Sequence, residues 1–67
     1  MTEIHVQLPD RLEVMKLPEA FCRGHLEIGR DGSLMFIGVF VGYDVHCRTL
    51  KAWASGTWRS AELKEAA

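Results

Sequence analysis

The 67-residue chain lacks the features that place a protein in a membrane or in an oxidising compartment. Its longest apolar run, residues 34–41, is far shorter than the roughly 20 residues that a membrane-spanning helix needs. Only two cysteines are present, Cys22 and Cys47, and the opening MTEIHVQL has no basic segment followed by an apolar one, as a secretory signal has. We therefore expect reduced thiols and a cytoplasmic protein.

The chain also lacks an excess of charge of either sign. Eight Lys and Arg residues oppose nine Asp and Glu residues, so general affinity for nucleic acid or for an anionic membrane is not expected. The arginines are spread along the chain rather than clustered: Arg11, Arg23, Arg30, Arg48 and Arg59. A single domain of this length, residues 1–67, buries only about 60% of its unfolded surface, which predicts self-association as a further source of stability.

No motif for a metal, a cofactor or catalysis stands out. The candidate zinc or thiol–imidazole residues are Cys22, His25, His46 and Cys47. Neighbours on a strand point to opposite faces, so His46 and Cys47 cannot converge on one ion or form a catalytic pair. The glycine-containing residues 29–32 and 38–42 lack the Lys-Ser/Thr ending of a phosphate loop. We expect no metal, no cofactor and no enzymatic activity.

What the chain does have is a strand-forming centre, residues 34–41, rich in β-branched and aromatic side chains. Gly42 and Tyr43 suit a two-residue type II′ turn with a positive φ at Gly42. This turn predicts a core face on which Phe40 pairs with Val45, Gly38 with Cys47 and Phe36 with Thr49. The opposite face is predicted to contact the C-terminal segment or another chain, and it carries Met35, Ile37, Val39 and Val41 beside His46 and Arg48.

The N-terminal residues predict a hairpin. A strand with one wet face is indicated because polar residues alternate with Ile4, Val6 and Leu8. Pro9 and Asp10 predict a turn into a second strand at residues 12–17. The apolar residues of that strand change face near Met15, which leaves two alternatives: a bulge there, or a strand covered on both sides.

A third strand is predicted at residues 25–29, followed by a turn at Arg30-Asp31-Gly32. A three-residue loop with Gly32 in the left-handed region pairs Ile28 with Leu34 and Leu26 with Phe36, whereas a two-residue loop pairs Ile28 with Met35. We favour the three-residue loop because it gathers the apolar residues on one face.

Three other segments complete the expected fold. Residues 18–23 predict one or two helical turns ended by Gly24, and residues 49–53 predict either a strand extension or a short helix ending at Gly56. Residues 60–67 predict a C-terminal helix that begins at a serine N-cap. The fold class is thus mainly β, on the border of α+β: a small antiparallel sheet or partly closed barrel of about five strands with a short C-terminal helix.

Aromatic and basic residues give the strongest recognition signal. Trp53 is expected in the core, whereas the sequence divides Trp58 evenly between core and surface. The predicted partner-binding residues are Met35, Ile37, Val39, Val41, Tyr43, His46, Arg48, Trp58 and Arg59.

Two functions of different classes are compatible with these features. The first is a non-enzymatic protein-binding module, a homodimer that covers part of a protein partner, such as an inhibitor or accessory subunit encoded by a mobile element. The second is a small barrel that binds single-stranded nucleic acid, which requires Arg11, Arg30, Arg48 and Arg59 to converge around Tyr43 or a tryptophan. A metal-binding or thiol-dependent protein is the third and least favoured hypothesis.

Overall fold

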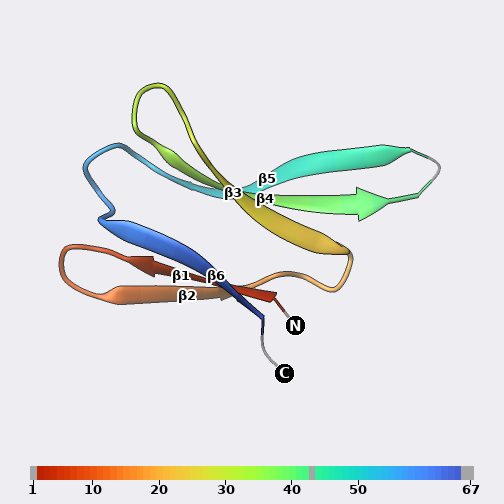
Figure 1. The fold of residues 1–67 in the computed structure, drawn as a ribbon, viewed down its shortest axis with the longest axis horizontal. Coiled ribbons are helices and arrows are strands. Elements are labelled where there is room, and N and C mark those ends of the chain that lie inside the picture. The colour runs from red at the N-terminus through yellow and green to blue at the C-terminus, as the bar shows by residue number, and fades with distance from the viewer. Residues whose placement is uncertain (1, 43, 66–67) are drawn as a thin grey trace.

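The computed structural model describes residues 2–42 and 44–65, which form strands and the connections between them (Figure 1). The six strands are β1 (Thr2–Gln7), β2 (Leu12–Lys16), β3 (Arg23–Ile28), β4 (Leu34–Val41), β5 (Val45–Trp53) and β6 (Ser60–Glu65). They form two antiparallel sheets, sheet A in the order β2-β1-β6 and sheet B in the order β3-β4-β5. The mainly β prediction is confirmed, but two separate sheets replace the expected single sheet or barrel.

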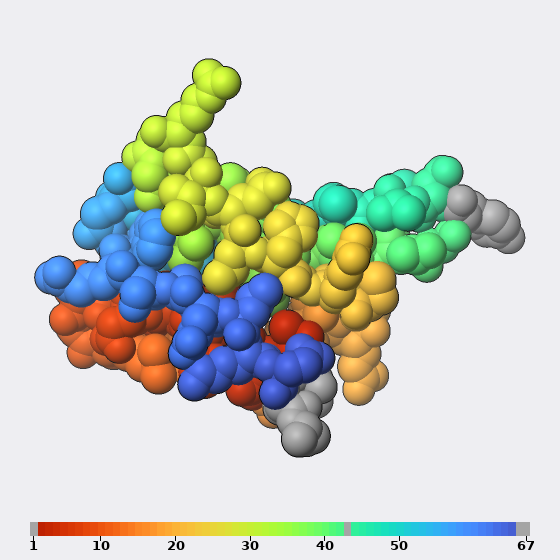
Figure 2. All heavy atoms as spheres, in the orientation of Figure 1, coloured from red at the N-terminus to blue at the C-terminus, as the bar shows by residue number. Residues whose placement is uncertain are grey.

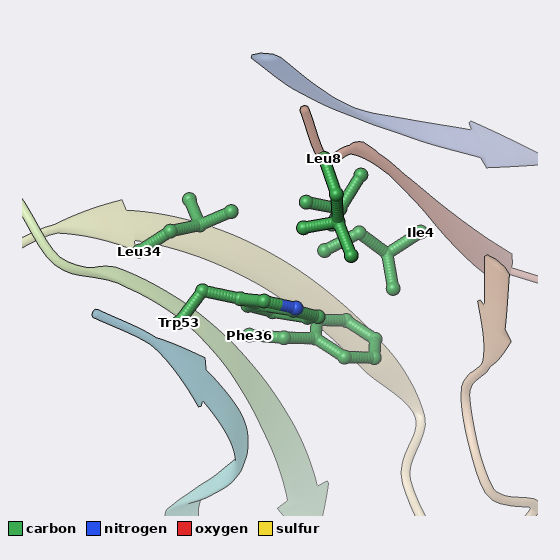
Figure 3. Packing of buried hydrophobic residues seen from close by; sticks show 6 residues of the cluster. Ile4, Leu8, Leu34, Phe36 and Trp53 are labelled. Carbon is green, nitrogen blue, oxygen red and sulfur yellow. The ribbon is translucent and has the colours of Figure 1, made fainter. Parts of the chain in front are cut away.

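The hydrophobic core lies between the two sheets, and each sheet contributes one face to it. Alternation along β1 places Ile4 and Val6 on the inner face of sheet A, where both are fully buried. Sheet B contributes Leu34, Phe36 and Trp53, and the Trp53 indole and the Phe36 ring lie together beneath Ile4 and Leu8 (Figure 3). The core position predicted for Trp53 is therefore confirmed.

The β3–β4 hairpin has the predicted three-residue loop. Ile28 pairs with Leu34 and Leu26 pairs with Phe36, and Gly32 has a φ of 87°. Asp31 supports this turn, because its Oδ1 accepts hydrogen bonds from the Ser33 amide at 3.0 Å and the Ser33 hydroxyl at 2.7 Å. These bonds, the backbone one first, hold the pKa of the Asp31 carboxyl below its ordinary value.

The predicted register of the β4–β5 hairpin is wrong by one residue. Phe40 pairs with His46 and Val41 pairs with Val45, so the loop holds residues 42–44 instead of two residues. Gly42 does not have the predicted positive φ, and Tyr43 lies outside the described residues. As a result, the core-side and outer-side residues of β5 are exchanged up to Thr49 relative to the prediction.

A bulge in the same hairpin changes the pairing farther along. The register shifts between Phe36 and Ile37, which leaves Leu50 as the extra residue of β5. Beyond it, Trp53 pairs with Leu34 and takes its place in the core. The strand alternative for residues 49–53 is thus confirmed, and Gly56, with a φ of 83°, belongs to a turn after β5.

Both predicted helical segments are wrong over the residues described. Residues 18–21 form a turn closed by the Phe21 amide and the Pro18 carbonyl at 3.0 Å, and Gly24 lies inside β3. Residues 60–65 form β6, whose Ala61 and Leu63 pair with Val6 and Ile4 of β1. So short a helix has little intrinsic stability, and pairing with β1 instead gives every second residue of β6 an apolar neighbour.

Neither alternative proposed for β2 is correct. Its pairing with β1 is regular, so there is no bulge at Met15, which faces inward and packs against the core. Leu12 and Val14 face away from sheet B and are 53% and 47% exposed, so that side of β2 is not covered.

Glu13 joins sheet A to sheet B at their β2 and β5 edges. Its carboxylate accepts hydrogen bonds from the Lys51 ammonium group and, at 3.1 Å, from the Trp53 indole N–H. Lys51 also lies 5.4 Å from the centre of the Trp53 ring. The bond from Lys51 first, and then that from Trp53, hold the pKa of Glu13 below its ordinary value of 4.5.

This arrangement predicts a loss of stability in acid. Because the pKa of Glu13 is lower in the folded chain than in the unfolded one, its contribution is complete above the ordinary value and disappears as the pH falls through the folded value. In urea titrations between neutral pH and pH of about 3, Glu13→Gln should show a weaker acid dependence of the unfolding free energy than the native chain. It should also cost roughly 1 kcal/mol at neutral pH, because a charged hydrogen bond becomes a neutral one.

Glu62→Gln is the matched control, because Glu62 is exposed on the outer side of β6. Its carboxylate lies 3.4 Å from the Lys64 ammonium group. Its acid dependence should match that of the native chain. Identical profiles for the Glu13 and Glu62 variants would contradict the role assigned to Glu13.

Candidate protein-binding face

Sheet B has an outer face that sheet A does not cover. We define the outer face as the side of sheet B turned away from the core. It carries Arg23, His25, Glu27, Met35, Ile37, Val39, Val41, Val45, Cys47, Thr49 and Ala52. Ile37 and Val39 are buried, yet neither belongs to the core cluster. Since sheet A packs on the opposite side, this burial comes from the flanking strands, where Arg23 and Cys47 lie on either side of Val39.

The outer face continues onto a projecting arm, which we define as residues 40–42 and 44–48 of the β4–β5 hairpin. β4 has 8 residues and β5 has 9, whereas no strand of sheet A exceeds 6. At about 3.3 Å per residue, β5 extends roughly 10 Å farther than β1. The hairpin accordingly stands away from sheet A (Figures 1 and 2). Val41 and Val45 pair near its tip and are each 66% exposed.

Aromatic packing fixes the base of the arm on its core side. The ring of Phe21 meets that of Phe40 edge to face at 5.5 Å, and Phe40 stacks on the His46 imidazole at 5.1 Å. Gly38 makes room for this packing, because a Cβ at position 38 would lie 2.6 Å from Phe21 Cδ1. The connector between β2 and β3 thus supports the arm through Phe21.

A shallow hollow of about 280 Å³ opens beside this connector. It is lined by Thr2, Leu17, Pro18, Glu19, Phe21, Cys22 and Glu65. Cys22 is exposed, and its thiol donates a hydrogen bond to the Val39 carbonyl at 3.1 Å. No histidine is among the described lining residues, so none is placed there to take the thiol proton.

The cysteines and histidines do not form a ligand cluster. His46 and Cys47 lie on opposite faces of β5, as expected of neighbouring strand residues. Cys22 and Cys47 are both free thiols. In residues 2–42 and 44–65, no group of three or more His, Cys, Asp or Glu side chains is arranged to hold a metal ion.

The structure brings together only some of the predicted partner-binding residues. Met35, Ile37, Val39 and Val41 share the outer face, as predicted from alternation along β4. His46 and Arg48 lie on the other side of the arm. Trp58 packs against the core and donates its indole N–H to the Gly32 carbonyl at 3.1 Å, and Arg59 is exposed in the β5–β6 connection. Tyr43 lies outside the described residues.

Val45 and Cys47 are outer-face residues that sequence reasoning missed. Alternation along the strand shows that Val45 and Cys47 share one face and that His46 and Arg48 share the other. Only the length of the β4–β5 loop decides which of the two faces points outward. Asp44 is the signal that could have indicated the longer loop, because aspartate is common in turns.

The arginines do not converge on one aromatic surface. Arg11, Arg30 and Arg59 lie in the connections β1–β2, β3–β4 and β5–β6, which gather at one end of the molecule, whereas Arg48 lies in the arm at the other end (Figure 1). Arg11 is also 3.5 Å from the carboxylate of Asp10.

Comparison with known proteins gives no relative on which to base a function: neither family models, nor curated proteins, nor solved structures match the chain. The described part of the chain has no helix that could cross a membrane.

Gly38 provides a test of the arm's support. Gly38→Ala places a methyl group against Phe21 and Leu50 and should destabilise the fold by about 1 to 3 kcal/mol through overpacking. Gly42→Ala is the matched control, because a Cβ at position 42 meets nothing within 4 Å. It should change the unfolding free energy by less than about 0.5 kcal/mol. Chemical denaturation compares the two, and equal losses would show that Phe21 does not pack on Gly38.

Proposed function

We propose that this protein is a non-enzymatic protein-binding module that acts by covering part of a protein partner. The observation that carries the proposal is the apolar stripe on the outer face, in which Ile37 and Val39 are buried among their neighbours while Val41 and Val45 at the arm are two-thirds exposed. Within the described residues no element of the fold lies over it. An inhibitor or an accessory subunit would work in this way.

The shape of the molecule supports this proposal. The radius of gyration is 12.3 Å, whereas about 11 Å is typical of a compact domain of this length. The accessible surface is 4750 Å², about 10% above the value typical of its mass. The projecting arm explains why both the radius of gyration and the accessible surface exceed the values of a compact domain. Its exposed valines lie where a partner could cover them together with the outer face.

The distribution of charge also favours a protein partner. Around the stripe lie Arg23, His25 and Glu27 of β3, and a mixed polar rim around an apolar centre is typical of protein interfaces. Single-stranded nucleic acid instead needs a basic groove with aromatic platforms. Here Arg48 lies far from the other three arginines considered for that role, and the Trp58 N–H is already bonded to Gly32.

Site-specific photo-crosslinking in the native host tests the proposal. A benzophenone amino acid at position 41, which is two-thirds exposed, should crosslink to a distinct host protein, giving a discrete adduct identified by mass spectrometry. A solvent-exposed position tolerates this replacement, so folding should be unchanged by circular dichroism.

Position 12 is the matched control, because Leu12 is also an exposed apolar strand residue but lies on the outer side of sheet A. It should give no such adduct. The same adducts from both positions, or none from position 41, would contradict the proposal.

A further inference from the structure

The arm leaves one strand edge unpaired. β5 is an edge strand of sheet B, and its C-terminal half lies close to β2 through Lys51, Trp53 and Glu13. Its N-terminal half, beyond sheet A, has no strand on its outer side among the described residues, and residues 45–49 are all exposed. An exposed strand edge offers unpaired N–H and C=O groups to another strand.

This free edge lacks the usual protection against pairing. Natural edge strands are commonly blocked by lysine, proline or a bulge. Residues 44–49 contain no lysine and no proline, and the bulge of β5 lies farther along, at Leu50. The charged residues in this stretch are Asp44 and Arg48, which have opposite signs, and neither is in an ion pair with another described residue.

The charges are self-complementary. Arg48 lies two residues after His46 in β5, so these two side chains share one side of the strand, and Asp44 lies in the bend that leads into β5, two residues before His46. In an antiparallel pair of identical β5 strands related by a two-fold axis at His46, Arg48 of each copy lies beside the bend that carries Asp44 of the other copy. The same register places Val45 opposite Cys47 on the outer side.

We infer that the partner of this edge is a second copy of the chain, joined through β5 in antiparallel register centred on His46. The two copies of sheet B then form one continuous six-stranded sheet. Two Asp44–Arg48 ion pairs then form at the two ends of the new strand pair, and Val45 and Cys47 of both copies join the two outer faces. This interface uses the edge of β5 and binds a second copy, whereas the outer face is proposed above to bind another protein. Pairing of the two edges also joins the outer faces of the two copies into one surface.

The charges favour this register over its neighbour. A two-fold axis at Cys47 would place Arg48 opposite His46 and Asp44 level with Leu50, and neither arrangement offers an ion pair. The interface is small, so we expect a weak dimer whose affinity falls with increasing salt.

Charge reversal tests the inference on the purified full chain. Sedimentation equilibrium from micromolar to millimolar concentration should show a monomer–dimer equilibrium for the native protein. Asp44→Lys and Arg48→Glu should each weaken dimerisation by about tenfold or more, because each creates two like-charge contacts. The double variant Asp44→Lys/Arg48→Glu should recover most of the native affinity, because the ion pairs re-form with their signs exchanged.

Lys64→Glu on β6 is the control for a change of net charge, because Lys64 is exposed on sheet A, and it should leave dimerisation unchanged. Circular dichroism should show that all variants are folded, since Asp44 and Arg48 are exposed. A monomeric native chain throughout, or a double variant weaker than either single one, would overturn the inference. Because this assay contains no other protein, its outcome is independent of the crosslinking result.

A cysteine pair tests the register. In a Cys22→Ser background, Val45→Cys should form a disulfide with Cys47 of the second copy under mild oxidation, since residues opposite each other in a sheet lie within disulfide range. The expected product is a covalent dimer in which peptide mapping links position 45 to position 47. A dimer linked only between the two Cys47 residues would overturn the register.

Discussion

The packing of Trp53 and Phe36 against Ile4 and Val6 is the contact on which the rest of the structure depends. Phe36, Ile4 and Val6 are fully buried, and Trp53 is 6% exposed. Burying side chains of this size contributes about 1.5 to 3 kcal/mol each, a large share of the stability of so small a domain. The chain is too short to build a second such layer, so each sheet has one face in the core and one face outside it.

The strands of the two sheets differ in length because the short chain covers only part of sheet B with sheet A. Sheet A is long enough to cover the part of sheet B that holds Leu34, Phe36 and Trp53, and the β4–β5 hairpin extends beyond it. Phe21 supports the start of this extension by packing on Gly38 and Phe40. The uncovered outer face and the unpaired edge of β5 are thus consequences of how the core is closed, and both lie in the part of the chain that we propose binds other chains.

Residue patterns predicted correctly those hairpins in which the turn residue and the alternation of apolar residues indicate the same strand register. The three-residue loop needs a left-handed residue, which Gly32 supplies without steric cost, and this loop aligns Ile28 with Leu34, so the predicted β3–β4 register was correct. In the β4–β5 hairpin, Gly42 suits a two-residue turn, but the loop has three residues, and one residue of difference exchanges the two sides of β5. The predicted side of the sheet is therefore correct for the residues of β4 and wrong for those of β5.

The helix predicted for the C-terminal segment was wrong for a different reason. Residues 60–65 contain good helix formers after a serine, but alternate residues also suit a strand, and six residues cannot distinguish the two periods. The free edge of β1 decides the outcome, because it pairs with all six residues of β6. Contacts between distant segments of this kind, like the bonds from Lys51 and Trp53 to Glu13, cannot be read from local patterns.

We place the contact between copies of this chain on the arm of sheet B rather than on sheet A. Amide NMR spectra of the isotope-labelled protein, recorded from micromolar to millimolar concentration, test this placement. We expect concentration-dependent shifts or broadening at residues 44–48, spreading to Val41 across the hairpin, with constant signals from β1, β2 and β6. Changes centred on Leu12 and Val14 of β2, or the same spectrum at all concentrations, would contradict it.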